Sequence, residues 1–233
     1  FKYGHKKVKK EEPWTGGLAE YILLVSGTKV FKVPENLSLE VACPANCTTA
    51  TNVAAFRVAG NVAGKVVLIM GAGMLGVTAC AMAKFNGASM VIVCDTNNQR
   101  LIKAREFGAD ESCLPEDLPK FVFDKTRGFG VDVMFELTGF PGAFENAFDC
   151  VGIGGKIVLV GSVFPSAPAS LLLEIVVRKL LSIEGIHNYT PDDLAHALFF
   201  LSKTNHLPWK SLVGIWLRLS EVDLAFQLAQ SPD

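Results

Sequence analysis

The chain has 233 residues, half of them hydrophobic, which suffices to bury a sizeable core in one large domain or two unequal ones. Lysine plus arginine total 22 against 23 aspartate plus glutamate, for a formal net charge of -1. No broad basic field is present, so we expect no nucleic-acid partner. Six scattered cysteines, with no paired spacing and no secretory leader before them, favour a reduced, cytoplasmic setting.

The first candidate elements lie in residues 65–85, KVVLIMGAGMLGVTACAMAKF, where eighteen consecutive residues carry no charge. A helix of that length would be roughly 27 Å long, just short of a roughly 30 Å hydrocarbon core, so length alone does not exclude a membrane span. The three glycines of GAGMLG would each weaken such a helix by up to about 1 kcal/mol. We therefore predict no span, but a buried strand over 65–70, a tight turn, and a helix that stops near Asn86-Gly87.

This turn and the next strand carry a pattern typical of dinucleotide binding. Gly71 permits the bend, Gly73 lets the backbone approach a pyrophosphate, and Gly76 lets the helix pack closely on the strand. The unpaired amides and the dipole of the helix start then face the anion. Asp95 ends the strand SMVIVCD, where its carboxylate can accept both ribose hydroxyls and disfavours a 2'-phosphate, so we expect NAD. Its alternative role is to cap the helix beginning near TNNQR.

Further buried strands are predicted over 131–139, 156–163 and 180–188, with the helical segment PGAFENAFDCVG between the first two. Alternating strands and helices predict an α/β fold with a parallel, doubly wound sheet and right-handed crossovers. Its ligand is expected at the carboxyl ends of the strands, at the switch point. Two of these strands end in small residues, which are candidates for the wall of the pocket around the nicotinamide. The alternative is that they only form ordinary turns. These residues are Thr138, Gly139, Val160, Gly161 and Ser162.

Several strings along the chain resemble the medium-chain, zinc-type alcohol dehydrogenases: GGLAEYILL, VFKVPENLSLEVAC, NCTTATNVAAF, VVLIMGAGMLGVTACAMAK and REFGADE. Within that family, KYGH, GAGMLG, GSVFP and GIHNY are similar to a clade associated with phosphonate catabolism. The resemblance implies the end of a GroES-like catalytic domain over 1–50, a Rossmann coenzyme domain over 51–187, and a segment returning to the catalytic domain over 188–233. Helical spacing in PDDLAHALFFLSK and EVDLAFQLAQ fits that return.

The resemblance also implies coenzyme contacts and a partner. Thr51 and the group Gly185, Ile186 and His187 would lie near the nicotinamide, and Arg100 beside Asp95 near the adenosine ribose. His187 can equally be a strand-end histidine with a satisfied hydrogen bond. Edge strands near KLLSIEGIHN would pair two copies into a homodimer. The full expected set of coenzyme-binding residues is Thr51, Gly71, Gly73, Met74, Leu75, Gly76, Asp95, Arg100, Thr138, Gly139, Val160, Gly161, Ser162, Gly185, Ile186 and His187.

The family's catalytic zinc has three protein ligands, and the residue that matches the third is Cys47. Read from composition alone, Cys47 would be a buried small hydrophobe; Cys43, four residues earlier, is interpreted as packing. The other two ligands and the four-cysteine structural zinc lobe of many members have no counterpart here. One cysteine cannot hold zinc alone, so we expect an incomplete dehydrogenase and assign no catalytic residue.

For the intact enzyme the resemblance implies NAD, zinc and a small alcohol or aldehyde substrate. Zinc acts as a Lewis acid on the substrate oxygen, and hydride passes to the nicotinamide. Two alternatives remain open: a zinc-independent, quinone-reductase-like enzyme of the same superfamily, and a non-catalytic nucleotide-binding or dimerising module.

Overall fold

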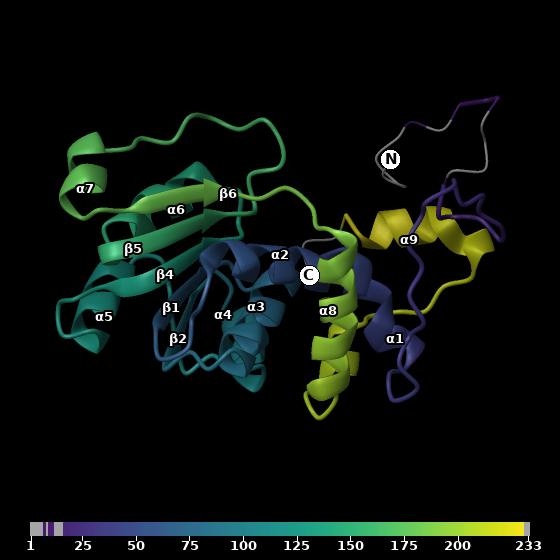
Figure 1. The fold of residues 1–233 in the computed structure, drawn as a ribbon, viewed down its shortest axis with the longest axis horizontal. Helices are drawn as coiled ribbons and strands as arrows, with labels where there is room; N and C mark the ends of the chain where they lie inside the picture. The colour runs from purple at the N-terminus through teal and green to yellow at the C-terminus, as the bar shows by residue number, and fades with distance from the viewer. Residues whose placement is uncertain (1–6, 8, 12–15, 231–233) are drawn as a thin grey trace. The chain divides into compact units, whose positions relative to one another are not determined.

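The computed structural model describes residues 7, 9–11 and 16–230, and the chain divides into two compact units. Residues 33–212 form the larger unit, which contains the whole sheet (Figure 1). The smaller unit combines residues 1–32 with 213–233; its described part is largely irregular and holds a 3-10 turn, Leu219–Glu221, followed by helix α9, Val222–Leu228. The expected domain boundaries at residues 50 and 187 stay predictions, and the KYGH string lies almost wholly outside the described residues.

The larger unit is built on a six-stranded sheet in the order β3-β2-β1-β4-β5-β6, with every neighbouring pair parallel. This order confirms the predicted doubly wound sheet and puts its switch point between β1 and β4. The strands are β1 (Val66–Met70), β2 (Met90–Cys94), β3 (Glu111–Cys113), β4 (Val131–Glu136), β5 (Val151–Leu159) and β6 (Ser182–Gly185).

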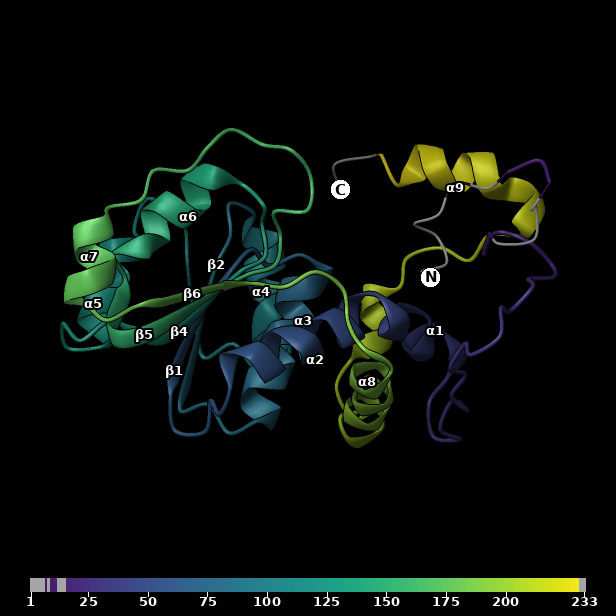
Figure 2. The same cartoon turned by 45° about the horizontal axis from the view of Figure 1, so that its top comes forward.

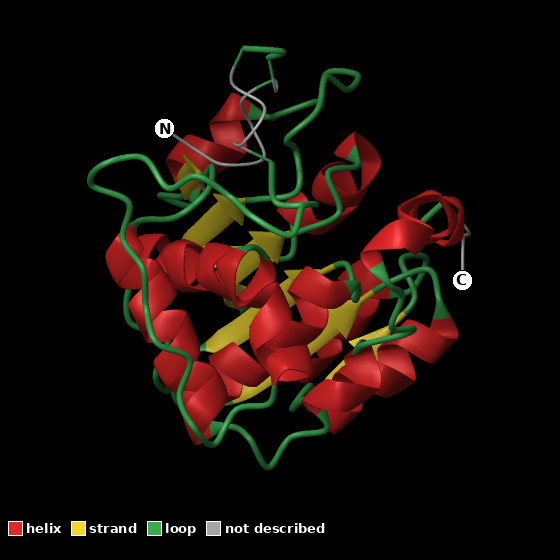
Figure 3. Ribbon diagram, turned by 90° about the vertical axis from the view of Figure 1, so that its right-hand side faces the viewer, coloured by secondary structure: helices red, strands yellow, loops and turns green. Residues whose placement is uncertain are grey.

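Helices cover both faces of this sheet (Figures 2 and 3). Helices α2, α3 and α4 pack on one face, and α5 and α6 on the other; α8 packs against α2. Burial on both faces explains why the central strands are apolar without alternation. The helices of this unit are α1 (Leu39–Ala42), α2 (Thr48–Ala59), α3 (Met74–Phe85), α4 (Asn98–Glu106), α5 (Leu118–Lys125), α6 (Pro141–Phe148), α7 (Leu173–Arg178) and α8 (Pro191–Lys203), with 3-10 helices η2 (Cys43–Asn46) and η3 (Trp209–Leu212).

The structure corrects several predicted element bounds. Strand β5 begins at Val151 instead of residue 156, and the strand expected over 180–188 shortens to β6. Strand β3 and helices α5 and α7, which are three, eight and six residues long, were not predicted. Two helical predictions are confirmed. Helix α8 spans the segment predicted over 191–203, and α3 ends at Phe85, just before Gly87, whose φ is +81°.

Among the described residues, no helix is long and apolar enough to cross a membrane.

Close contact between two glycines fixes the angle at which α3 leaves β1. Gly71 has a φ of +96°, a conformation that side-chain-bearing residues rarely adopt. A Cβ atom at Gly76 would lie 1.8 Å from the carbonyl oxygen of Gly71, which no side chain tolerates. Gly73, between them, has a φ of -69° and nothing within 4 Å of the place where a Cβ would stand. Gly71 and Gly76 are therefore structural requirements of the turn, and Gly73 is not.

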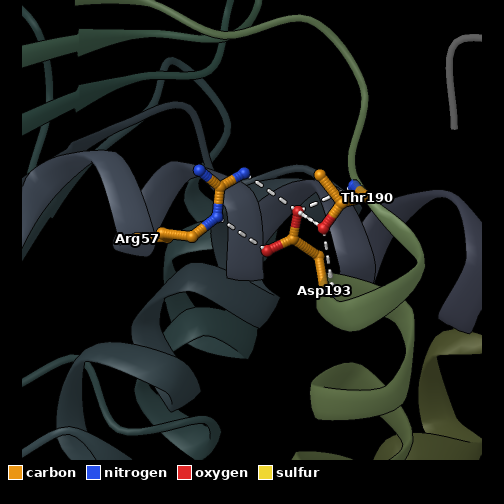
Figure 4. Close-up of polar contacts among 3 residues, drawn as sticks. All are labelled: Arg57, Thr190 and Asp193. Carbon is orange, nitrogen blue, oxygen red and sulfur yellow. Dashed lines mark hydrogen bonds and ion pairs between the residues drawn. The ribbon is translucent and has the colours of Figure 1, made fainter.

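A second link holds α2 to the start of α8 (Figure 4). The Arg57 guanidinium donates from Nε to Oδ1 of Asp193 at 2.9 Å and from Nη2 to Oδ2 at 3.0 Å. Thr190 donates its backbone N–H and its hydroxyl to Asp193 Oδ2, and its own hydroxyl caps α8. Burial alone would raise the pKa of Asp193, but the hydrogen bonds from Arg57 and Thr190 outweigh it and lower that pKa.

Gly76→Ala is expected to unfold the chain or destabilise it by more than about 3 kcal/mol, because overpacking of this severity exceeds the usual range of about 1–3 kcal/mol. The matched variant Gly73→Ala adds the same methyl group in open space and should change the free energy of unfolding little. Urea denaturation followed by circular dichroism measures both. Equal stability of the two variants would contradict the close contact.

The Arg57–Asp193 link should make stability depend on pH in the acid range. Because the folded-state pKa of Asp193 is lowered, its contribution is complete above the unfolded pKa of about 3.9 and is lost as pH falls through the folded value. We expect Asp193→Asn to cost about 1–3 kcal/mol at pH 7 and progressively less below pH 4. Urea midpoints for the two proteins between pH 3 and pH 7 check this; a constant difference would show that the carboxylate charge does not matter.

Candidate functional site

A cavity of about 470 Å³ opens at the carboxyl ends of β1, β2 and β4, on both sides of the switch point. The ends of these strands supply Met70 and Cys94 to its wall, and α6 supplies Gly142, Ala143 and Asn146. Its lining brings together five residues that the sequence predicted for coenzyme binding: Gly71, Gly73, Asp95, Arg100 and Thr138. The position of the cavity agrees with the rule that ligands of open parallel sheets bind at the switch point.

The glycine turn is held by hydrogen bonds to the end of the neighbouring strand β2. Gly71 N–H donates to the carbonyl of Cys94 at 2.7 Å, and Ala72 N–H donates to Asp95 Oδ2 at 2.6 Å. The other oxygen of Asp95 accepts from Asn97 N–H at 2.8 Å. Asn97, not Asp95, caps α4, so the alternative capping role for Asp95 is wrong. Asp95 thus fixes the turn while its remaining lone pairs stay available to ribose hydroxyls.

The amino end of α3 supplies the anion-binding groups. The N–H groups of Met74, Leu75 and Gly76 have no carbonyl partner within the helix, because they belong to its first turn. Asn52 of α2 is fully buried and donates from Nδ2 to the carbonyls of Leu75 and Thr48, both at 3.1 Å. This amide ties the start of α3 to α2. Sequence reasoning missed Asn52, whose only signal was an amide among the small and apolar residues of ATNVAAF.

A buried carboxylate shapes the opposite wall of the cavity. Glu136, 1 % exposed, ends β4 and accepts hydrogen bonds from Thr138 N–H at 2.7 Å, Gly139 N–H at 3.0 Å and the Thr138 hydroxyl. Charge-assisted bonds of this kind allow an ionised group to be buried. Glu136 was not predicted either, although a lone carboxylate closing the apolar strand VDVMFE was a visible signal.

The remaining predicted coenzyme residues lie outside the cavity lining: Thr51 is in α2, Met74, Leu75 and Gly76 are in α3, and the others end or follow β4, β5 and β6. Gly161 approaches Gly139 so closely that a Cβ at Gly139 would stand 2.5 Å from the carbonyl oxygen of Gly161. Ile186 N–H, after β6, donates to the carbonyl of Leu159 at 3.0 Å. The residues that follow the ends of β5 and β6 are Val160, Gly161, Ser162, Ile186 and His187, and Gly185 ends β6 itself.

Cys47 lies directly before α2, exposed, and its carbonyl accepts the N–H of Thr51 at 3.1 Å. Burial and, secondly, the electrostatic effect of Cys47 raise the pKa of Tyr189 in the loop after β6. Cys43, interpreted as a packing residue, is exposed, so that interpretation is wrong. Within the part of the chain that the structure describes, no three His, Cys, Asp or Glu side chains cluster as metal ligands. One thiol does not make a zinc site, so the donors described here do not fit the metal by themselves.

A second cavity, of about 440 Å³, lies among α2, α3 and α8 and is lined mainly by aromatic and aliphatic side chains, with the Arg57–Asp193 pair in its wall. None of the predicted site residues lines it. The candidate coenzyme site is therefore the cavity at the carboxyl edge of the sheet.

Comparison with known proteins identifies the family. A model of the family described as "Zinc-binding dehydrogenase" matches residues 75–203. The chain belongs to the zinc-binding dehydrogenase family. The L-threonine 3-dehydrogenase of Pyrococcus furiosus is 38% identical over 173 residues, which cover 73% of this chain and 49% of that protein. Thus this zinc-binding dehydrogenase chain spans about half the length of the curated relatives it matches.

Solved structures of dehydrogenases share the fold. An alcohol dehydrogenase from Thermotoga maritima superposes with a TM-score of 0.89 at 30% identity, covering 96% of this chain and 63% of that one. The alcohol dehydrogenase TADH from Thermus sp. ATN1 gives a TM-score of 0.83 at 25% identity, covering 92% and 62%. The expected zinc-type, medium-chain dehydrogenase family and Rossmann fold are confirmed. The likeness to the phosphonate-associated clade stays a prediction.

Proposed function

We propose that this chain is the coenzyme-binding part of an NAD-dependent alcohol or aldehyde oxidoreductase. The observation that carries the proposal is the Gly71–Gly76 turn, which lets α3 begin beside a cavity at the switch point that Gly71 and Gly73 line. Family membership supports the same reaction class.

The residues of the cavity fit NAD. The amides of Met74 and Leu75 would hold the pyrophosphate, assisted by the positive end of the α3 dipole. Gly73, with open space where a side chain would stand, lets the dinucleotide approach the backbone. Asp95 would accept the adenosine ribose hydroxyls, with Arg100 beside it. The nicotinamide, when bound, supplies the hydride acceptor or donor, and Thr51, Thr138, Gly139, Val160, Gly161, Ser162, Gly185, Ile186 and His187 are proposed to surround it.

Cys47 is the proposed zinc ligand of the intact enzyme. Its position directly before α2 and its electrostatic effect on Tyr189, in the loop after β6, support this proposal. The described residues contain no cluster of three His, Cys, Asp or Glu side chains that could hold a metal, so no chemical step is assigned to a metal here.

The proposed substrate class is a small alcohol or the corresponding aldehyde or ketone. Relatives named L-threonine 3-dehydrogenase and structural neighbours named alcohol dehydrogenase support this class. A quinone-reductase-like activity and a purely non-catalytic role receive no support from these relatives. All six cysteines are free thiols, which supports the proposed reducing, cytoplasmic setting.

NAD should bind this chain in a 1:1 complex measurable by isothermal titration calorimetry. Gly73→Ala, whose fold we expect to be intact, should lower the affinity at least about tenfold, because its methyl group fills space that the pyrophosphate needs. Gly214→Ala is the matched control, since it adds a methyl group in open space and does not line the cavity. Absence of any binding by the folded parent chain at millimolar NAD would refute the proposed function.

We also propose that two copies pair through β6, which forms one edge of the sheet. Ser182, Glu184 and Gly185 are exposed along this strand, so backbone groups there are open to pairing. Sedimentation velocity at about 10 μM should then show a dimer; a monomer at that concentration would count against the pairing.

A further inference from the structure

Two cysteines end neighbouring strands beside the candidate coenzyme cavity. Cys94 is the last residue of β2 and Cys113 the last residue of β3, and the two are direct partners in the parallel ladder. Partner residues of a parallel pair point to the same face, and neighbouring strands lie about 4.8 Å apart. Disulfides join residues whose Cα atoms are about 4.4–6.8 Å apart. The backbone thus brings these two thiols within the range of a covalent bond.

Cys94 lies in the wall of the cavity, next to Cys113 in the sheet. Hydrogen bonding with Cys94 lowers the pKa of the Cys113 thiol from its ordinary value. Cys94 lines the 470 Å³ cavity, and Cys113 is 7 % exposed. The other buried thiols differ: burial raises the pKa of Cys80, in the middle of α3, and raises that of Cys150 to about 12. Among the four buried cysteines, a lowered pKa and a partner cysteine directly across the parallel ladder occur together only at Cys113.

We propose that Cys94 and Cys113 form a site of reversible oxidation, which a hydroperoxide converts to a disulfide through the coenzyme cavity. The Cys113 thiolate attacks one peroxide oxygen and becomes a sulfenic acid; with hydrogen peroxide, the other oxygen leaves as water after taking a proton. The Cys94 thiol then attacks the sulfenic sulfur, the S–S bond forms, and a second water is released. Two thiols and one peroxide thereby give one disulfide and two waters, and an added dithiol reverses the reaction.

Oxidation should act on the coenzyme turn. A disulfide needs Cβ atoms about 3.8 Å apart, so closing it draws the ends of β2 and β3 together by about 1 Å. The carbonyl of Cys94 accepts the N–H of Gly71 at 2.7 Å, and the carbonyl of Cys113 accepts the N–H of Asp95 at 3.4 Å. Both donor residues line the cavity. Disulfide formation therefore displaces the groups that, under the proposed function, hold NAD, and bound NAD covers Cys94.

The test uses a Cys43→Ser/Cys47→Ser background, which removes the two exposed thiols and leaves four. After hydrogen peroxide treatment, thiol titration of the denatured protein should find two thiols instead of four. Non-reducing tryptic mapping should join the peptide of Cys94 to that of Cys113, which cleavage after Arg100, Lys103 and Arg105 separates. Dithiothreitol should restore all four thiols.

Cys94→Ser and Cys113→Ser in that background should each abolish the cross-link, and Cys80→Ser, the matched buried control, should leave it unchanged. Mapping of the background protein itself requires no further variant, so the result does not depend on the folding of the serine variants. Four remaining thiols after treatment, or a cross-link from Cys94 to Cys150, would overturn the proposal.

The link to coenzyme is measured separately. NAD affinity of the reduced background protein should fall at least tenfold after oxidation, and saturating NAD should slow disulfide formation. If the reduced protein binds no NAD, the proposed function is refuted. The peptide map still tests whether Cys94 and Cys113 form a disulfide. If NAD binds and no cross-link forms, only the oxidation site fails.

Discussion

The arrangement of β1, the glycine turn and α3 depends on the contact between the carbonyl oxygen of Gly71 and the Cα atom of Gly76. A methyl group at residue 76 would stand 1.8 Å from that oxygen, so α3 can begin this close to β1 only where a side chain is missing. The close start places the amino end of α3, with its unpaired first-turn amides, next to Gly71 and Gly73 of the cavity wall. The proposed anion site therefore depends on a packing constraint, because the same glycine permits the contact and fixes where the positive end of the helix dipole lies.

Two carboxylates turn this local geometry into a fixed cavity. Asp95, after β2, accepts from the turn that follows β1, and Glu136, at the end of β4, accepts from the turn that follows its own strand. Each replaces the lost hydration of a charge by hydrogen bonds from backbone N–H groups that need acceptors in any case. Strand ends on both sides of the switch point are thereby held by charge-assisted bonds, while the space between them stays open to a ligand.

The sequence could predict the run from β1 through the turn to α3 and β2, because strands buried on both faces are plain apolar runs and three glycines mark the turn. It could not predict the roles of Glu136 and Asn52, since their partners are backbone groups that only the folded chain brings near. For Cys43, the sequence pattern led to a wrong interpretation. Its spacing to Cys47 suggested one helix face, but Pro44 falls in a four-residue 3-10 helix, where that periodicity does not apply.

Helix α2 connects every part of the larger unit that the proposed reaction requires. Cys47 precedes the helix, Asn52 ties it to the start of α3, and Phe56 stacks on Phe135 of β4 with ring centroids 4.5 Å apart. The next residue, Arg57, binds Asp193 at the start of α8. Contacts on several sides explain why a helix rich in alanine and threonine is largely buried. Because the proposed metal ligand and the coenzyme turn are both attached to this one helix, neither can shift relative to the other without breaking the buried Asn52 hydrogen bonds, whose loss would leave polar groups unpaired in the core.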